Sequence, residues 1–311
     1  MLEYQSLVRF EDVDLDALEL QGLDLLIGMR GHTDAGHVAS QVRTELLDSL
    51  NPRLIASFDT DQLINYRERR PQISFLGDHF AAYQPPRLEL YLLTDGLEQD
   101  FLFLTGPEPD LAWERVSRAV VALVEALNVR LTVSFGAVPM PVPHTRQMGV
   151  TAHGNRKDII EGISTWSPTA ELPASMVNLV EVRLTEASRD AVGYSMHVPH
   201  YLSEAEYPQV AVGALEYVGA AMGLGLPTDR LREAGRRLEG QIAEQVAGSP
   251  EVQKMVAGFE ERFDQHVPET ERRSLLVSLD AEVPDGDELA MAVEAFLSGM
   301  GDQGGPAATD S

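Results

Sequence analysis

The 311-residue sequence contains no cysteine. This absence excludes a disulfide framework, a thiolate nucleophile and a zinc site built from thiolates, and it favours a reducing compartment. Long apolar runs are also missing. No stretch approaches the roughly 20 apolar residues of a membrane span, and the N-terminus lacks the basic start and apolar core of a signal peptide. The sequence therefore predicts a soluble, cytoplasmic protein.

Basic side chains are scarce. The chain has 24 Lys and Arg against 49 Asp and Glu, which gives a formal net charge of −25. A surface of this charge repels phosphate backbones and anionic headgroups. We therefore expect neither nucleic acid nor a membrane as a partner.

Periodicity in the first 60 residues indicates an α/β fold. The short apolar run at 23–29 is typical of a strand buried on both faces, and residues 38–50 carry apolar side chains at helical spacing. Residues 53–58 are a second candidate strand. The intervening segment is too short for anything but a parallel crossover, which is the unit of an α/β sheet.

Further elements are predicted along the chain. Strands are expected where residues alternate in polarity or form short apolar runs: 73–76, 80–83, 88–93, 101–104, 129–135, 176–184 and 193–198. The first two of these form a hairpin or an edge pair. Helices are expected where apolar residues recur at helical spacing: 111–127, 207–222, 229–246 and 250–263. The three prolines within 136–143 predict an extended loop, because proline does not fit a central strand.

The composition changes after residue 246. Residues 247–311 carry fourteen acidic and four basic side chains, and a candidate helix over 288–297 precedes a Gly-rich end. We predict an α/β main domain over 1–246, an acidic helical appendage over 247–300 and a disordered tail over 301–311. The helices of the appendage are a candidate binding surface for another protein.

Five segments of the chain resemble, in order, the motifs of one protein family. They are Gly28–Ser40, Asp59–Pro71, Leu104–Trp113, Pro143–Arg146 and His197–Tyr201. The first of them contains the Asp-Ala-Gly sequence that opens the first helix of the family. On these segments the chain resembles the proteasome assembly chaperone family, in its bacterial and actinobacterial-like branch.

The resemblance implies a three-layer α/β core with a mixed, mostly parallel sheet, like that of nucleoside phosphorylases and hydrolases, with added C-terminal helices. It also implies assembly, so we expect a homo-oligomer, with a trimer favoured over a dimer. Eukaryotic members dock on proteasome rings through a C-terminal hydrophobic-Tyr-any tripeptide, whereas this sequence ends in Thr309-Asp310-Ser311. Direct docking on the proteasome is therefore not expected.

The loop after the first strand is a candidate binding site. A Gly-rich turn between a parallel strand and a helix leaves helical N–H groups that favour an anion. The candidate residues of this opening loop are Arg30, Gly31, His32, Thr33, Asp34 and Gly36. In the alternative interpretation, Gly31 and Gly36 only permit the turn, and Thr33 or Asp34 caps the helix.

Side chains after later strands could complete the same pocket, because ligands of open α/β folds bind beyond the C-terminal ends of the strands. The candidates are Tyr66, Arg70, His144 and Arg146. Together with the opening loop they could hold a carboxylate, a phosphate or a base. Alternatively, Arg67, Arg69 and Arg70 pair with the surplus acids of this subunit or of a neighbouring one.

Motifs for metal binding and catalysis are absent from the sequence. The pairs His32/His37 and His197/His200 lack the spacing of a zinc-binding helix, and Ser195 near His197 lacks the Gly-x-Ser-x-Gly turn. We predict no metal and no cofactor, and a protein-binding, assembly or adaptor protein rather than an enzyme. The alternative is a phosphorylase-like enzyme, or a protein that binds a small anion or a nucleoside at the opening loop.

Overall fold

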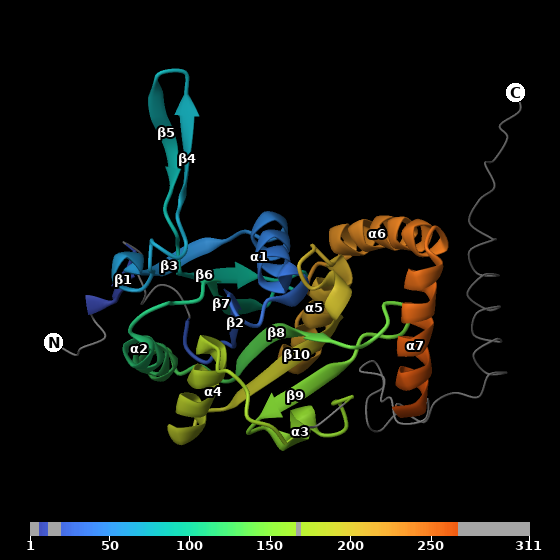
Figure 1. Cartoon of the computed structure of the whole chain (residues 1–311). Coiled ribbons are helices and arrows are strands. Elements are labelled where there is room, and N and C mark those ends of the chain that lie inside the picture. Colours follow the sequence, from blue (N-terminus) through green and yellow to red (C-terminus); the bar gives the residue numbers. More distant parts are fainter. Residues whose placement is uncertain (1–5, 12–19, 166–168, 267–311) are drawn as a thin grey trace, which may run out of the picture. The chain divides into compact units, whose positions relative to one another are not determined.

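The computed structural model describes residues 6–11, 20–165 and 169–266 and is centred on an eight-stranded sheet (Figure 1). In spatial order the strands are β1 (Val8–Phe10), β3 (Arg53–Phe58), β6 (Glu89–Thr94), β7 (Asp100–Pro107), β2 (Leu25–Arg30), β8 (Thr132–Met140), β10 (Ala191–Pro199) and β9 (Val150–Gly154). The pairs β7–β2, β2–β8 and β8–β10 are parallel, and the other pairs are antiparallel. These pairings make β3, β7, β2, β8 and β10 run in the same direction, so five of the eight strands are parallel and the predicted mixed, mostly parallel sheet is confirmed.

Helices cover both faces of the sheet, as the three-layer prediction requires (Figure 1). Helices α1 (Val38–Ser49) and α5 (Pro208–Met222) pack on one face, and α2 (Trp113–Ala126) and α4 (Met176–Glu186) pack on the other. Strand β2 is apolar on both sides and lies between these two layers of helices. Leu26 belongs to the core under α1 and α5, whereas Leu25 and Ile27 belong to the core under α2 and α4, because successive strand residues point to opposite faces.

The remaining helices follow the central ones along the chain. The short α3 (Lys157–Ile160) lies beside β9, α6 (Asp229–Ala247) packs on α5, and α7 (Pro250–His266) packs on α6. None of the described helices is both long and apolar enough to span a membrane. The predicted helix over 288–297 and the predicted disordered tail over 301–311 lie outside the described residues.

The strand predicted over 176–184 is wrong, because these residues form helix α4. The run is rich in Val and Leu, which suit either element, but its buried residues recur at helical spacing: Met176, Val177, Val180 and Leu184. A local signal also marks the start of the helix. The hydroxyl of Ser175 accepts a hydrogen bond from the backbone N–H of Asn178, and the Asn178 side chain accepts one from the N–H of Ser175.

The extended loop predicted over 136–143 is wrong for its first half, because β8 continues to Met140. The backbone N–H of Ala137 donates to Thr33, on the β2 side of the strand. The nitrogen of Pro139 faces the same side two residues further on, where no described strand pairs with β8. The missing N–H of this proline therefore costs no sheet hydrogen bond, and β8 pairs with β10 as far as Met140.

A second sheet contains only the hairpin of β4 (Gln72–Leu76) and β5 (His79–Gln84), which was predicted as a strand pair. This hairpin projects away from the eight-stranded sheet (Figure 1). We call residues 72–84 the arm.

Candidate functional site

Carboxylates of the chain itself hold the opening loop between β2 and α1. Glu108 Oε2 accepts a hydrogen bond from the backbone N–H of His32 at 2.9 Å, and its Oε1 accepts from the N–H of Met176 at 2.6 Å, at the start of α4. Asp34 Oδ1 accepts from the N–H of Ala39 at 2.7 Å, in the first turn of α1. The backbone donors of His32 and Ala39 therefore already face anions, and both anions belong to the chain.

The two glycines of this loop are required by close contacts. A Cβ atom on Gly31 would lie 2.0 Å from Oε2 of Glu108, so glycine lets the carboxylate approach the backbone. Gly36 has a φ of 68°, and its N–H donates to the carbonyl of Ser203 at 2.7 Å. Burial raises the pKa of Asp34 to about 6, although the Ala39 N–H and nearby positive charges act to lower it.

A separate pocket lies between the start of α1, the ends of β2 and β7, and the base of the arm. Its cavity volume is about 450 Å³. We call it the arginine pocket, because five arginines line it: Arg30, Arg43, Arg69, Arg70 and Arg87. No aspartate or glutamate is among the described residues of the lining.

Three of these arginines have a carboxylate partner outside the lining. Arg43 Nη2 lies 3.2 Å from Oε2 of Glu89, and Arg87 Nη1 lies 3.6 Å from Oε1 of the same residue. Arg69 forms an ion pair with Asp110. Glu89 is buried in β6 and does not line the pocket. Its carboxylate therefore offsets the charges of Arg43 and Arg87 without occupying the cavity.

The other two arginines are those that the sequence analysis selected. Arg30 ends β2, and Arg70 lies just before the arm. Neither residue forms a described ion pair within 4.0 Å, although Arg30 attracts the more distant carboxylate of Asp34. The structure thus brings Arg30 and Arg70 to one pocket, while the side chains of Arg43 and Arg87, which sequence reasoning missed, complete it.

The other predicted site residues lie elsewhere. Tyr66 donates a hydrogen bond from its hydroxyl to Asp61 Oδ1 at 2.6 Å and does not line the arginine pocket. His144 Nδ1 lies 2.8 Å from the hydroxyl of Tyr201, and burial lowers the pKa of this histidine.

Arg146 binds α7 instead of the opening loop. Its Nη1 lies 3.1 Å from Oε1 of Glu260, and its Nη2 lies 2.7 Å from Oδ2 of Asp264. Such pairing with surplus acids was the alternative for Arg67, Arg69 and Arg70, of which Arg69 pairs with Asp110. Arg146 therefore fastens the last described helix to the body and does not join Arg30 and Arg70.

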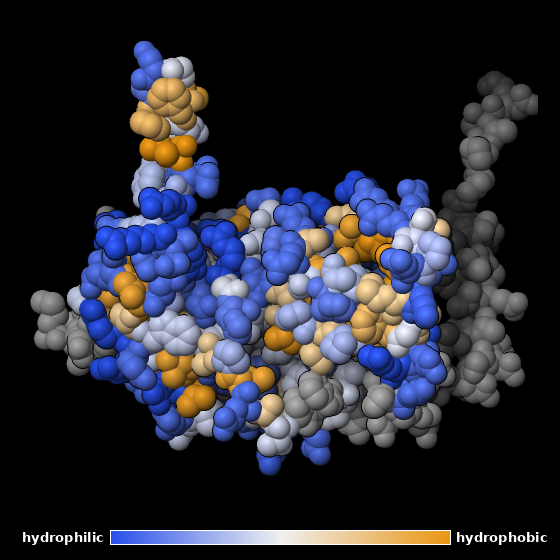
Figure 2. Space-filling model, in the orientation of Figure 1, coloured by the Kyte–Doolittle hydropathy of each residue, from blue (hydrophilic) through white to orange (hydrophobic). Residues whose placement is uncertain are grey.

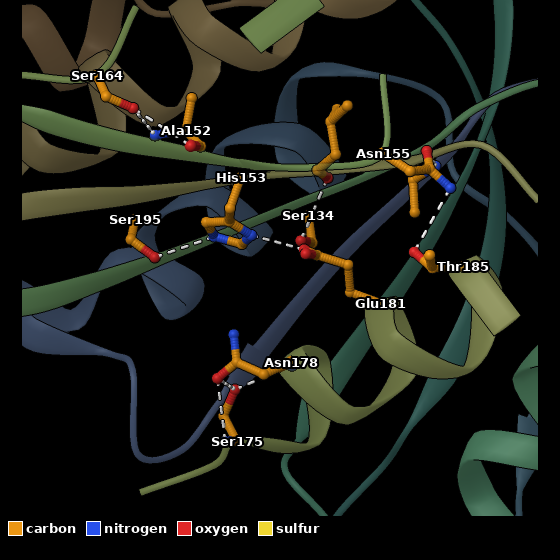
Figure 3. A network of polar contacts seen from close by, with 12 residues as sticks. Ser134, Ala152, His153, Asn155, Ser164, Ser175, Asn178, Glu181, Thr185 and Ser195 are labelled. Atoms are coloured by element: carbon orange, nitrogen blue, oxygen red, sulfur yellow. Dashed lines mark hydrogen bonds and ion pairs between the residues drawn. The ribbon is translucent and has the colours of Figure 1, made fainter. Parts of the chain in front are cut away.

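A chain of polar contacts lies on the face of the sheet that α4 covers (Figure 3). Ser195 Oγ in β10 lies 3.2 Å from Nε2 of His153 in β9, and Nδ1 of His153 lies 2.6 Å from Oε2 of Glu181 in α4. The order of serine, histidine and carboxylate is that of a hydrolase triad. Sequence reasoning paired Ser195 with His197 and missed His153, which only the antiparallel pairing of β9 and β10 brings alongside.

Two features favour a structural role for this network. Strand β10 pairs with β8 on one side and β9 on the other, so the backbone N–H groups around Ser195 serve the sheet and are not free to bind an oxyanion. A Cβ atom on Gly193 would lie 2.1 Å from the ring of His153, so the ring lies directly against the strand. We assign the network to the packing of α4 and propose no reaction there.

The arm exposes large apolar side chains on both of its strands (Figure 2). Five of them are between 50% and 68% exposed: Ile73, Phe75, Leu76, Phe80 and Tyr83. The rings of Phe75 and Phe80 contact each other, with centroids 5.1 Å apart. The sequence predicted the hairpin, but its alternating apolar residues gave no sign that neither face would be covered.

Residues 28–246 match the model of the PAC2 family. The chain is similar to the solved structure of a Mycobacterium tuberculosis protein of unknown function, Rv2714, with 39% identity, coverage of 84% of this chain and 89% of that one, and a TM-score of 0.79. A Corynebacterium glutamicum protein of unknown function has 34% identity, 84% and 97% coverage, and a TM-score of 0.78. Among curated proteins, none matches the chain.

The same fold occurs in a proteasome-assembly chaperone homologue of Mycobacterium tuberculosis, Rv2125. This protein is 23% identical to the chain, the match covers 75% of this chain and 100% of that one, and the TM-score is 0.69. At this identity the likeness establishes the fold.

Proposed function

The chain belongs to the PAC2 family, and from this premise we propose that it is a protein-binding assembly or adaptor protein that assembles with copies of itself through the arm. The single observation that carries the proposal is the exposed apolar surface of the arm. The fold shared with a proteasome-assembly chaperone homologue supports a role in assembly.

The physical argument concerns the stability of the arm. An isolated two-stranded hairpin is only marginally stable in water, and this one is not hydrogen-bonded to the eight-stranded sheet. Large apolar side chains contribute about 1.5–3 kcal/mol each when they move from water into a fully buried site. An arm with five such side chains exposed gains most of its stability from a surface on another polypeptide.

The charge of the arm favours a second copy of this chain as that polypeptide. Residues 72–84 contain one acidic residue, Asp78, and one histidine, His79, and no lysine or arginine. Each chain carries a formal charge of −25, so contacts between copies are least opposed by repulsion where the contact surface is nearly uncharged. A homo-oligomer is therefore part of the proposal, and the family resemblance favours a trimer.

The opening loop supports the protein-binding proposal over a site for a nucleoside or anion in that loop. Its donors at His32 and Ala39 are bonded to Glu108 and Asp34, so a ligand anion there would meet two carboxylates of the chain. Repulsion between like charges opposes such binding.

The test measures molar mass by light scattering for the wild type and for the double variant Phe75→Asp/Phe80→Asp. We expect an oligomer for the wild type and a monomer for the variant, because a charge on each strand opposes burial of the arm. The matched control is Leu97→Asp, which changes an exposed apolar residue outside the arm and should leave the oligomer intact. A wild type that stays monomeric at micromolar concentration, or a variant that assembles like it, would refute self-assembly through the arm.

The adaptor role needs a second measurement. Proteins captured by the full chain from its native host are compared with those captured by a protein that ends at residue 248, and each candidate is then purified and mixed with both forms. We expect a partner that binds the full chain directly and requires the C-terminal helices. If no purified candidate binds, the adaptor part of the proposal fails while self-assembly stands.

A further inference from the structure

Positive charge is concentrated in the arginine pocket although the chain as a whole is strongly acidic. The chain has 24 basic against 49 acidic side chains, yet the pocket is lined by five arginines and by no described acid. Two carboxylates, Glu89 and Asp110, pair with three of the arginines. Arg30 also attracts the more distant carboxylate of Asp34. Five positive charges against these three negative ones leave a surplus of two among the described residues around the pocket.

The surplus has an electrostatic cost that a bound anion would relieve. Arg30 and Arg70 approach the same cavity without a described ion pair within 4.0 Å, and like charges that share a site repel each other. Guanidinium groups bind phosphate and carboxylate oxygens through two parallel N–H bonds, which makes arginine suited to this kind of ligand. Ser40 and Thr105 also line the pocket and provide hydroxyl groups beside the guanidinium groups.

The size of the pocket indicates a ligand larger than a single ion. Its cavity volume of about 450 Å³ falls within the roughly 300–1,000 Å³ of small-molecule sites. Apolar residues also line the cavity: Ile64, Pro71, Pro85, Pro86 and Pro107. They leave room for the body of a ligand between the charged groups.

We propose that the arginine pocket binds a small molecule carrying two or more anionic groups, phosphate or carboxylate, and that Arg30 and Arg70 contact these groups directly. Arg30 extends from the end of a sheet strand, and Arg70 from the base of the arm. A ligand that contacts both residues connects the arm to the body. This binding is independent of whether copies of the chain assemble.

The experiment titrates the full chain with pyrophosphate and with citrate by calorimetry, at constant ionic strength set with chloride. We expect one site in the wild type and a dissociation constant at least about tenfold larger in Arg30→Gln/Arg70→Gln, because both charge-assisted contacts are lost. The matched control is Arg67→Gln, an exposed arginine three positions from Arg70 that does not line the pocket; its affinity should equal that of the wild type. Arg70→Lys keeps the charge but loses the paired N–H geometry and should bind with intermediate affinity.

Two further readouts separate this site from general effects of salt and from failure to fold. Without ligand, the double variant should melt at about the same temperature as the wild type, because the substitutions remove repulsion within the pocket together with the longer-range attraction between Arg30 and Asp34. With ligand, backbone amides at 69–72 and 84–87 should exchange more slowly in the wild type only. The proposal is overturned if neither anion binds at millimolar concentration, if Arg67→Gln weakens binding as much as the double variant, or if chloride alone reproduces the effect. Tighter binding of tetraglutamate than of both small anions would overturn the small-molecule assignment in favour of an acidic peptide.

Discussion

At the scale of single residues, Glu108 joins parts of the chain that are far apart in sequence. Its carboxylate accepts hydrogen bonds from the loop before α1 and from the first residue of α4, while its own N–H donates to the carbonyl of Arg30. The side chain is buried, so its charge is stabilised mainly by these donors. Gly31 leaves the space that this carboxylate occupies, because the Cβ atom of any larger residue would collide with it.

We predict that Glu108→Ala lowers the free energy of unfolding by about 2–4 kcal/mol, because it removes two hydrogen bonds to a charged acceptor and leaves the Met176 N–H buried without one. Urea denaturation measures the change. Glu125→Ala, at an exposed helical position, is the control and should change stability by less than about 0.5 kcal/mol. A similar small effect for Glu108→Ala would show that the loop does not depend on this carboxylate.

A second prediction at this scale concerns His197, which is 4% exposed in β10. Burial lowers its pKa to about 4, so the folded protein keeps it neutral where the unfolded chain already binds a proton. Its contribution to stability is complete above pH 6.5 and is lost as the pH falls from 6.5 towards 4, to an extent on the order of 3 kcal/mol.

Asp34 changes the stability of the folded protein in the opposite direction between about pH 4 and pH 6. Its pKa is raised to about 6, so the folded state holds a proton that the unfolded state has lost, and stability from this group falls as the pH rises from about 4 to 6. The two contributions are separated by measuring unfolding against pH for His197→Gln and Asp34→Asn. We expect His197→Gln to reduce the loss of stability on acidification and Asp34→Asn to increase it. Parallel pH profiles for wild type and His197→Gln would contradict the assignment.

At the scale of elements, α7 packs against the body through buried apolar side chains, ring contacts and ion pairs. Its Val256 and Phe263 are only 5% and 8% exposed. Phe259 lies against His200 and Tyr201, with ring centroids 5.3 and 6.1 Å away, and Arg146 binds two carboxylates of the helix. These ion pairs are partly exposed, and such pairs contribute only about 0–1 kcal/mol each. The boundary predicted at residues 246 and 247 falls at the end of α6, just before this helix.

We predict that a protein ending at residue 248 keeps the α/β core, because no described residue of α7 belongs to either of the two cores that flank the sheet. Its near-ultraviolet circular dichroism and its refolding should match those of the full chain. In the full chain, Arg146→Ala should raise hydrogen exchange at residues 252–263 and leave β2 and β8 unchanged. Loss of cooperative unfolding after truncation would show instead that the α/β domain extends beyond residue 248.

At the scale of the whole molecule, net charge governs how copies of the chain meet. A charge of −25 on each copy opposes association, and salt screens this repulsion over a Debye length of roughly 8 Å at physiological ionic strength. We predict that the oligomer expected from the arm becomes more populated as sodium chloride rises from about 0.02 M to about 0.3 M. Light scattering at fixed protein concentration measures the change. Dissociation by salt would indicate that ion pairs, and not the apolar arm, hold the copies together.

The sequence by itself determined the features that depend only on residues close together in the chain. The apolar run of β2, the periodicity of α1 and the hairpin all follow from local spacing, and five motifs in order, one of them around Asp34, indicated the family. Residues 176–184 were misassigned because Val and Leu suit both a strand and a helix, and the cap at Ser175 that distinguishes them was not used.

Only the tertiary structure decided which distant side chains meet. Arg30 and Arg70 share a pocket because the end of β2 and the base of the arm lie side by side there. Arg146, which comes after β8, instead forms ion pairs with α7. Glu108 reaches His32 across 76 positions because β7 and β2 are neighbours in the sheet. Local periodicity sets the elements through short-range sterics and hydrogen bonds, but the strand order that places these charges is set by the packing of the entire core.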